Sequence, residues 1–264
     1  MTTAASTSGL PLAPRPALQP QPRARRSGLV LAWARCTDEL REAQRLRFDV
    51  FSRELGARLA TPLAGHDIDR FDDYCEHLLV RDAASWEVIG TYRVLTPTQA
   101  RRAGGTYSDQ EFDLAPLDPL RTRMVELGRS CVHAEHRHGG VVLALWSELA
   151  AFMARNTLDT MIGCASIPMQ HHGPPGAAAV WRQLCLSHLA PLHYQVRPHL
   201  ALPLAHGLLP QGMTAPPLIR AYLRLGARLL GPPAWDPAFN TADLPMMMRT
   251  QDLPPRYRQG TSRG

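Results

Sequence analysis

Two charged residues stand inside a short apolar segment of the chain, MVELGRSCV at residues 124–132. The segment reads as a strand, and a strand with a purely structural role would favour Val or Ile where Glu126 and Arg129 occur. A positioned carboxylate is a standard acceptor for a proton from an amine, and a guanidinium group can hold a carboxylate through two hydrogen bonds. The pair therefore indicates chemistry on a charged substrate.

The turn that follows this strand is basic and carries two glycines. HAEHRHGG at 133–140 precedes a run whose apolar residues recur at helical spacing up to Met153. A glycine-bearing turn at a helix N-terminus gathers backbone N–H groups and the positive end of the helix dipole around one point. The pattern predicts an anion site at His138, Gly139 and Gly140, suited to the phosphate of a carried acyl group.

An acid-rich loop lies upstream of the strand. Within ten residues it holds Asp67, Asp69, Asp72, Asp73 and Glu76. Such a loop is often no more than solvated surface. Beside Arg47, Arg93 and Arg129, however, it offers complementary charges for binding an amino acid.

The elements that must position these residues alternate along the chain. We expect strands near 29–34, 124–132, 160–167 and 242–250, a hairpin over 78–96, and helices near 37–55, 140–156, 177–191 and 216–231. Residues 101–123 read as a loop with at most one helical turn. Mixed strands and helices in this order predict an α/β sandwich around a mixed, mostly antiparallel sheet.

Composition limits the classes of protein to which the chain can belong. Its 264 residues, 45% of them apolar, fit one domain, alone or with short additional segments. The chain has no apolar run of 18 or more residues, so we expect no membrane-spanning helix. Five scattered cysteines indicate reduced thiols, and the histidines match no zinc template, so we expect no metal. No GxSxG, Walker or GxGxxG signature is present.

Residues 1–28 differ from the rest of the chain, 29–264. They are rich in Pro, Ala, Ser and Thr, and their four arginines supply +4 of the net charge of +6. We interpret them as a disordered basic tail, which is either a solubilising extension or a contact for anionic lipid or nucleic acid. No folded nucleic-acid motif occurs, so we expect no nucleic-acid partner. The chain's own pattern leaves the oligomeric state open.

A second basic feature lies near the C-terminus. Arg220, Arg224 and Arg228 fall at i, i+4 and i+8 of the helix expected over 216–231. The stripe is either an ordinary surface or a contact for an acidic carrier protein or an anionic bilayer. We therefore expect a cytoplasmic protein that can lie at the inner face of the membrane.

Several ordered blocks carry a resemblance to a known family. The pattern Arg47-x-x-x-Phe51, then Asp69-x-x-Asp72, Gly90-x-x-Arg93 and Glu126-Leu-x-Arg129 resembles the acyl-homoserine-lactone synthases, which belong to the GNAT superfamily of acyltransferases. The finer match, over about 29–250, is to the L-ornithine N-alpha-acyltransferases of bacterial ornithine-lipid synthesis. Its blocks are FDVFSRELGA, DRFDDYCEHLLV, VIGTYRVL, ELGRSCVHAEHRHGGVVLALW, IGCAS, LIRAYLRLGA and DPAFNTADL.

The resemblance implies a reaction and a set of roles. A 3-hydroxyacyl group on the phosphopantetheine of acyl carrier protein would pass to the alpha-amine of L-ornithine, giving lyso-ornithine lipid, with no permanently bound cofactor. Glu126 is the expected base, and the backbone near Cys131 and Val132 the expected oxyanion donor. Asp69 and Asp72 would pair with the two ammonium groups. The substrate-binding set is completed by Arg47, Phe51, Arg93 and Arg129.

The sequence of the glycine-bearing turn bears on whether the acyl donor is acyl carrier protein or CoA. The GNAT loop usually reads (Q/R)-x-x-G-x-(G/A), and HRHGGV at 136–141 departs from this pattern. A weaker pyrophosphate site favours acyl carrier protein, whose arm has one phosphate, over CoA. The alternative is another GNAT-type N-acyltransferase, either acyl-homoserine-lactone-like or dependent on acyl-CoA.

Overall fold

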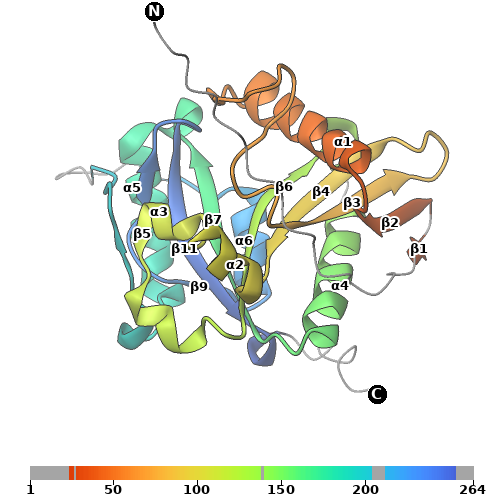
Figure 1. Ribbon diagram of the computed structural model, residues 1–264. Coiled ribbons are helices and arrows are strands. Elements are labelled where there is room, and N and C mark those ends of the chain that lie inside the picture. The colour runs from red at the N-terminus through yellow and green to blue at the C-terminus, as the bar shows by residue number, and fades with distance from the viewer. Residues whose placement is uncertain (1–23, 27, 138–139, 204–211, 254–264) are drawn as a thin grey trace, which may run out of the picture.

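The chain folds around one large twisted sheet flanked by helices on both faces (Figure 1). The computed structural model describes residues 24–26, 28–137, 140–203 and 212–253. In the sheet, neighbouring strands follow the order β1-β2-β3-β4-β6-β7-β11-β10, and β9 pairs with β11. Its strands are β1 Ala24–Arg26, β2 Leu29–Trp33, β3 Glu76–Asp82, β4 Val88–Leu95, β6 Met124–Val132, β7 Thr160–Pro168, β9 Arg228–Leu229, β10 Ala234–Asp236 and β11 Thr241–Arg249. The ladder between β6 and β7 is parallel, and the other pairings are antiparallel.

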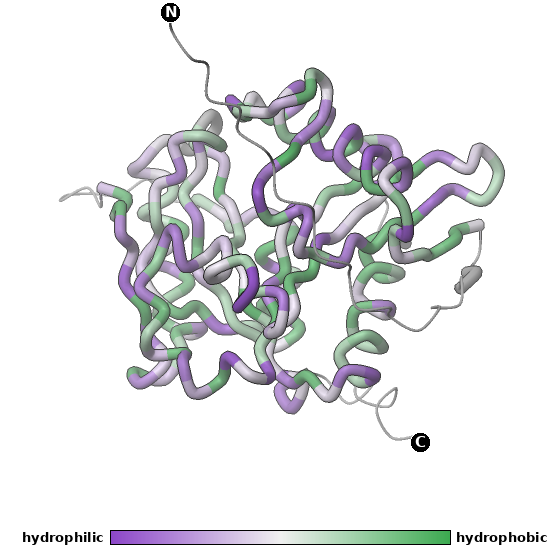
Figure 2. Tube along the Cα trace, in the orientation of Figure 1, coloured by the Kyte–Doolittle hydropathy of each residue, from purple (hydrophilic) through white to green (hydrophobic). Residues whose placement is uncertain are grey.

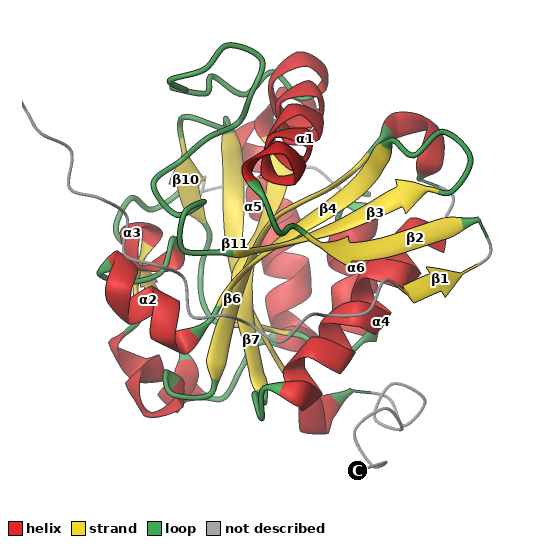
Figure 3. Ribbon diagram, turned by 45° about the vertical axis from the view of Figure 1, so that its right-hand side comes forward, coloured by secondary structure: helices red, strands yellow, loops and turns green. Residues whose placement is uncertain are grey.

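Helices cover both faces of this sheet (Figures 1 and 3). On one face lies α1 Thr37–Phe48, which continues as a π-helical turn, Asp49–Glu54. On the other face α4 Gly140–Arg155, α5 Met169–His188 and α6 Pro217–Arg224 pack into the main hydrophobic core. Hydrophobic residues run along α4 in Figure 2, because this helix is buried against β2, β3 and β4. The predicted α/β sandwich with a mostly antiparallel sheet is confirmed.

The segment expected to be a loop at 101–123 is more regular than predicted. It contributes to α2 Pro97–Ala103 and forms α3 Ser108–Glu111, the short strand β5 Phe112–Asp113 and a 3-10 turn at Ala115–Leu120. Thr96 caps α2 by accepting from the Gln99 N–H, Pro97 occupies the first turn, and Gly104 ends the helix at φ +77°. These are ordinary start and stop signals for a helix. Strand β5 pairs with β8 Arg197–Pro198 apart from the main sheet.

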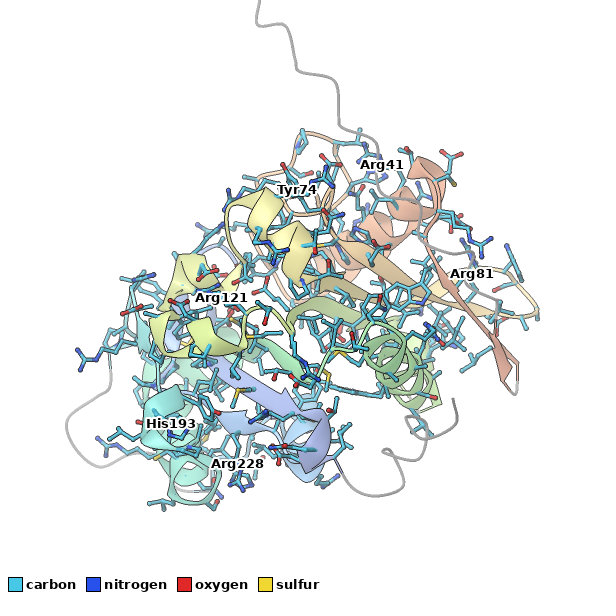
Figure 4. The ribbon with its side chains drawn as sticks, turned by 60° about the horizontal axis from the view of Figure 1, so that its bottom comes forward. Arg41, Tyr74, Arg81, Arg121, His193 and Arg228 are labelled. Carbon is cyan, nitrogen blue, oxygen red and sulfur yellow. The ribbon has the colours of Figure 1, made fainter. Side chains whose placement is uncertain are left out.

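The basic helix near the C-terminus is shorter than predicted. Helix α6 ends at Arg224, and Gly226 follows at φ +96° with no room for a Cβ atom, which would lie 2.7 Å from the Asp252 carbonyl oxygen. Arg228 therefore lies on β9 instead of the helix, at the periphery of the molecule in Figure 4. The predicted stripe is reduced to Arg220 and Arg224.

The terminal regions are only partly described. Residues 24–26 of the predicted tail form β1, which pairs with Leu29–Leu31 of β2; the prediction for residues 1–23 lies outside the described residues. Within the part of the chain that the structure describes, no helix combines the length and apolarity that crossing a bilayer requires.

The parallel strands β6 and β7 are paired over only the first third of their length. Their ladder runs from Met124 and Thr160 to Glu126 and Ile162 and then stops, although both strands continue for six more residues. We call this point the fork. Beyond it, among the strands that the structure describes, β6 pairs with β4 alone, through a bulge where Arg129 has φ +51°. The fork opens the sheet beside Glu126, the residue expected to do chemistry.

Candidate active site

A cavity of about 220 Å³ opens next to the fork. Four residues predicted from sequence line it: Phe51, Arg93, Glu126 and Arg129. Its other walls come from β4, β7, β11, the Tyr107–Ser108 turn and the loop around Phe239. The structure therefore brings together predicted residues that are far apart in the sequence, and we call this space the main cavity.

Behind the main cavity three arginines and three aspartates of the predicted loop form one buried network. Arg47 donates to Asp67 and Asp72, Arg93 donates to Asp69 and Asp72, and Arg129 donates to Asp67 and Asp69, at distances from 2.7 to 3.1 Å. Arg47 and Asp72 are almost fully buried, at 0% and 2% exposed. Although burial opposes it, the charges of Arg47 and Arg93 hold the pKa of Asp72 below its ordinary value. The carboxylates thus stay ionised and fix the guanidinium groups.

Two of these arginines retain nitrogens that face the main cavity. Among the described residues, hydrogen bonds engage only Nη1 of Arg93 and only Nε and Nη2 of Arg129. The Arg129 guanidinium also stacks against aromatic rings, with its carbon 4.5 Å from the Phe239 centroid and 5.0 Å from that of Tyr107. Ion pairs on one side and rings on the other fix its orientation. The remaining N–H groups are placed to bind an anion.

Glu126 is held at the fork by the turn before α3. Its carboxylate accepts hydrogen bonds from the backbone N–H groups of Tyr107 and Ser108, both at 2.7 Å, and from the Ser108 hydroxyl at 2.6 Å. Burial raises the pKa of Glu126, in opposition to the hydrogen bonds from Ser108 and Tyr107. A buried carboxylate with a raised pKa that still lines a cavity has the properties of a general base.

The turn that holds Glu126 is itself braced. Asp109 accepts from the Thr106 N–H at 2.7 Å and forms a two-point ion pair with Arg121, at 2.7 and 3.0 Å. Arg121 is labelled in Figure 4, beside the α2–α3 segment. Sequence reasoning missed the contribution of this segment because it acts largely through backbone N–H groups, which any residue type supplies.

The main cavity also has an acidic wall, which no sequence prediction named. Asp236 and Asp243 line the cavity and are 7% and 4% exposed, and Glu111 lies next to Asp243. Burial, with the negative charge of Asp236, raises the pKa of Asp243 to about 6. Among the described residues, no arginine, lysine or histidine forms a salt bridge with any of the three. This wall can therefore accept a cation from the cavity.

The same wall contains the described side chains that come closest to a metal-binding set. Ligand atoms of Glu111, Cys164 and Asp243 lie within 4.8 Å of one another. The Cys164 thiol, however, donates to Oε2 of Glu111 at 3.0 Å, and burial raises the pKa of this thiol well above its usual range. A metal would require that proton to leave, so the cluster is better described as hydrogen-bonded acids.

Other predicted residues lie away from the main cavity. Arg47, Asp69 and Asp72 are absent from its lining, and Val132 pairs with Gly90 in the ladder and packs into the main core. Gly140, expected in the turn before the helix, is the first residue of α4, whereas His138 and Gly139 lie outside the described residues. The departure of the turn from the GNAT pattern is smaller than HRHGGV implied, because Arg137 stands three residues before Gly140 and only Val142 differs.

Comparison with known proteins decides the family. Residues 46–147 match the model of the acetyltransferase (GNAT) domain. The chain is 36% identical over 249 residues to the L-ornithine N(alpha)-acyltransferase of Rhodobacter capsulatus, covering 86% of this chain and 92% of that protein. It is 37% identical over 243 residues to the enzyme of that name from Brucella abortus, with 83% of each chain covered. The chain belongs to the L-ornithine N(alpha)-acyltransferase family.

A solved structure supports the fold. A CoA-dependent acyl-homoserine lactone synthase superposes with a TM-score of 0.51 at 17% identity, covering 84% of this chain and 80% of that chain. At this identity the likeness concerns the fold alone. For an L-ornithine N(alpha)-acyltransferase, the main cavity with its basic and acidic walls is the candidate active site, and the chain is an N-acyltransferase of the GNAT type.

Proposed function

We propose that this enzyme acylates the alpha-amine of L-ornithine in the main cavity, using a 3-hydroxyacyl group carried by acyl carrier protein. The observation that supports the acceptor is the division of the cavity into a basic wall, at Arg93 and Arg129, and an acidic wall, at Asp236 and Asp243. An amino acid with a second ammonium group presents matching charges at its two ends.

The acceptor's carboxylate is assigned to the basic wall. Arg93 and Arg129 each keep N–H groups toward the cavity, and their ion pairs with Asp69 hold them in place. In this proposal Asp69 and Asp72 position arginines and do not touch the ammonium groups. Arg47 does not contact the substrate in this proposal. It is fully buried and holds the aspartates of the network in place through its ion pairs with Asp67 and Asp72. Phe51 contributes apolar wall and packs edge-on against Phe239.

The two ammonium groups are assigned to different carboxylates. The alpha-ammonium lies toward Glu126, which takes its proton directly or through one water so that the free amine can attack the thioester. The side-chain ammonium lies toward Asp243 and Asp236. Their burial without a salt bridge to any described residue makes this wall a suitable partner for a positive group.

The donor is assigned to the fork. Because β6 and β7 separate beyond Glu126, a pantetheine arm can run between them and bring its thioester to the cavity. Its phosphate would lie near the start of α4, at Gly140, where backbone N–H groups and the helix dipole favour an anion. Attack of the amine on the thioester carbon breaks the C–S bond and releases the carrier thiol. The product is an amide of the lyso-ornithine lipid type.

The proposed macromolecular partners are assigned from the basic residues on the surface of α6. Acyl carrier protein is acidic as a class, and Arg220 and Arg224 on α6 offer a basic surface to it or to an anionic bilayer. We propose peripheral contact with the cytoplasmic face of the membrane, where a lipid product is delivered.

The test offers the purified full-length protein two donors and several acceptors. A 3-hydroxyacyl-ACP and the matching acyl-CoA are each incubated with L-ornithine, L-lysine, L-glutamine and L-norvaline, and amide products are identified by mass spectrometry. We expect N-alpha-acylornithine, formed faster from the ACP donor. Amide formed from acyl-CoA alone would contradict acyl carrier protein as the donor and favour the CoA-dependent alternative. If no donor and acceptor pair gives an amide, the proposed N-acyltransferase activity is refuted.

A further inference from the structure

Three hydroxyl-bearing residues in the lining of the main cavity, Tyr92, Ser130 and Tyr222, have no role in the reaction described above. The hydroxyls of Tyr92 on β4 and Tyr222 on α6 lie 3.0 Å apart, and Ser130 on β6, which lines the main cavity with them, is close enough to lower the pKa of both tyrosines against the effect of burial. Tyr92 is 5% exposed. These residues come from three separate elements, so their convergence is a product of the fold.

This hydroxyl cluster stands where two cavities meet. Beyond the fork lies a second cavity, lined by Met161, Met246, Met247, Met248, Trp146 and other residues, none of them charged among the described ones. Tyr92 and Tyr222 line both this space and the main cavity, together with Leu127, Cys164 and Ala165. The second cavity is small, about 40 Å³, so only a short stretch of an acyl chain fits it, and a chain whose thioester lies in the main cavity would enter it beside the cluster. Methionines suit such a chain because they adapt to irregular apolar shapes.

The chemistry of the cluster restricts what it can bind. Burial raises the pKa of Tyr222 to about 12 and that of Tyr92 well above its usual range, so both remain neutral hydroxyls. Trp146 packs edge-on against both rings, at 6.3 and 5.4 Å between centroids, and fixes their positions. Neutral, fixed hydroxyls at the mouth of an apolar space match a neutral polar group, and an unsubstituted chain would gain nothing from them.

We propose that Tyr92, Ser130 and Tyr222 recognise a hydroxyl group on the acyl chain close to its thioester, and so select the donor. The inference rests on the proposed function and adds the residues that read the donor's substituent. A hydroxyl further along the chain would fall among the methionines and lose its partners. The cluster is already hydrogen-bonded within itself, so the gain is about that of one neutral hydrogen bond, roughly a tenfold preference.

The experiment compares two donors that differ by one oxygen. Values of kcat/KM are measured with L-ornithine and either 3-hydroxyacyl-ACP or the unsubstituted acyl-ACP of the same length. We expect the wild-type enzyme to prefer the hydroxylated donor about tenfold. Tyr222→Phe and Ser130→Ala should each lower the rate with that donor and leave the rate with the unsubstituted donor near its wild-type value. Tyr194→Phe, which removes a hydroxyl outside both cavities, should keep the preference.

The unsubstituted donor also serves as the folding control, because a misfolded variant loses both activities and its thermal unfolding transition shifts. An equal loss on both donors in a variant that unfolds like the wild type would overturn the inference and place the hydroxyls on the thioester or the leaving thiol. A wild-type enzyme that forms amide without preference would overturn it as well. No amide from either donor would instead refute the proposed function, and the inference with it.

Discussion

Gly163 of β7 lies so close to Leu127 of β6 that no side chain fits between the two strands. A Cβ atom at Gly163 would stand 2.3 Å from the carbonyl oxygen of Leu127. These residues come immediately after Ile162 and Glu126, the last pair of the parallel ladder. The contact therefore sets where the strands begin to separate, and so it sets the position of Glu126 relative to the fork.

We expect Gly163→Ala to force β6 and β7 apart at this point. The backbone oxygen cannot move away as a flexible side chain could, so the substitution should cost about 1–3 kcal/mol of unfolding free energy. It should also lower kcat, because Glu126 shifts relative to the thioester. Thermal unfolding and steady-state kinetics check both effects. Gly140→Ala, whose added Cβ atom meets nothing within 4 Å, should leave stability nearly unchanged.

Replacing the expected base gives the second prediction. Glu126→Gln keeps the size of the side chain but cannot carry a proton away, and we expect kcat to fall about 100-fold or more with little change in the KM for ornithine. Because burial raises the pKa of Glu126, the wild-type rate should rise with pH through an apparent pKa above that of an ordinary glutamate.

The amide that Glu126→Gln introduces brings its own NH₂ group toward the N–H groups of Tyr107 and Ser108, so structural damage must be measured separately. Ser108→Ala provides this control, since it removes one donor to the carboxylate and leaves the carboxylate in place. A Glu126→Gln enzyme that retains the wild-type kcat and pH profile would remove Glu126 as the base.

Part of the cavity lining could be predicted because its residues differ from their neighbours in the sequence. Glu126 and Arg129 are charges in an apolar strand, and the structure confirms the strand and places both residues in the cavity lining. Asp243 differs from its neighbours in the same way within TADLPMMMR but was missed. It becomes meaningful only when β11 pairs with β7 and Asp243 comes opposite Ser166, which brings this distant part of the chain to the cavity.

Other parts of the site could not be read from residue types. The hydrogen bonds that fix Glu126 include two backbone N–H groups, which carry no side-chain signature. The acid-rich loop lies beside the arginines, as expected, but its spacing could not distinguish carboxylates that bind a substrate from carboxylates that hold arginines. That distinction depends on burial, which the packing of α1 on β4 and β6 decides.

The buried ion pairs behind the cavity should dominate the stability of this region. Arg47→Met deprives Asp67 and Asp72 of their fully buried partner, and we expect a loss of about 3–5 kcal/mol by urea unfolding. Arg53→Met removes an exposed pair with Asp49, whose side chains are 70% and 49% exposed, and should cost less than about 1 kcal/mol.

The loss of unfolding free energy in Arg47→Met should depend on pH in a defined direction. The pKa of Asp72 is lowered in the folded protein, so its contribution to stability is present above the ordinary pKa of an aspartate and is lost as pH falls. The gap between the wild type and Arg47→Met should therefore narrow below about pH 4. A gap that stays constant down to the acid transition, or equal losses for Arg47→Met and Arg53→Met, would show that the buried network does not carry this stability.

The acidic wall gives the last prediction, on acceptor choice. Asp243→Asn keeps the shape of the side chain and its hydrogen bond from Thr241, but removes the charge assigned to the ornithine side-chain ammonium. We expect the ratio of kcat/KM for ornithine to that for norvaline, which lacks this ammonium, to fall about 10- to 100-fold. Asp49→Asn, on the exposed end of the π-helical turn, is the matched control and should keep the ratio.

The pH dependence of the same ratio tests the mechanism independently of Glu126, whose titration affects both acceptors equally. Since burial raises the pKa of Asp243 to about 6, the wild-type preference for ornithine should be full above this pH and decline as pH falls through it. Asp243→Asn should show a low ratio with no such transition. If Asp243→Asn discriminates as well as the wild type at every pH, the acidic wall does not bind the side-chain ammonium, and the acceptor must lie the other way round in the cavity.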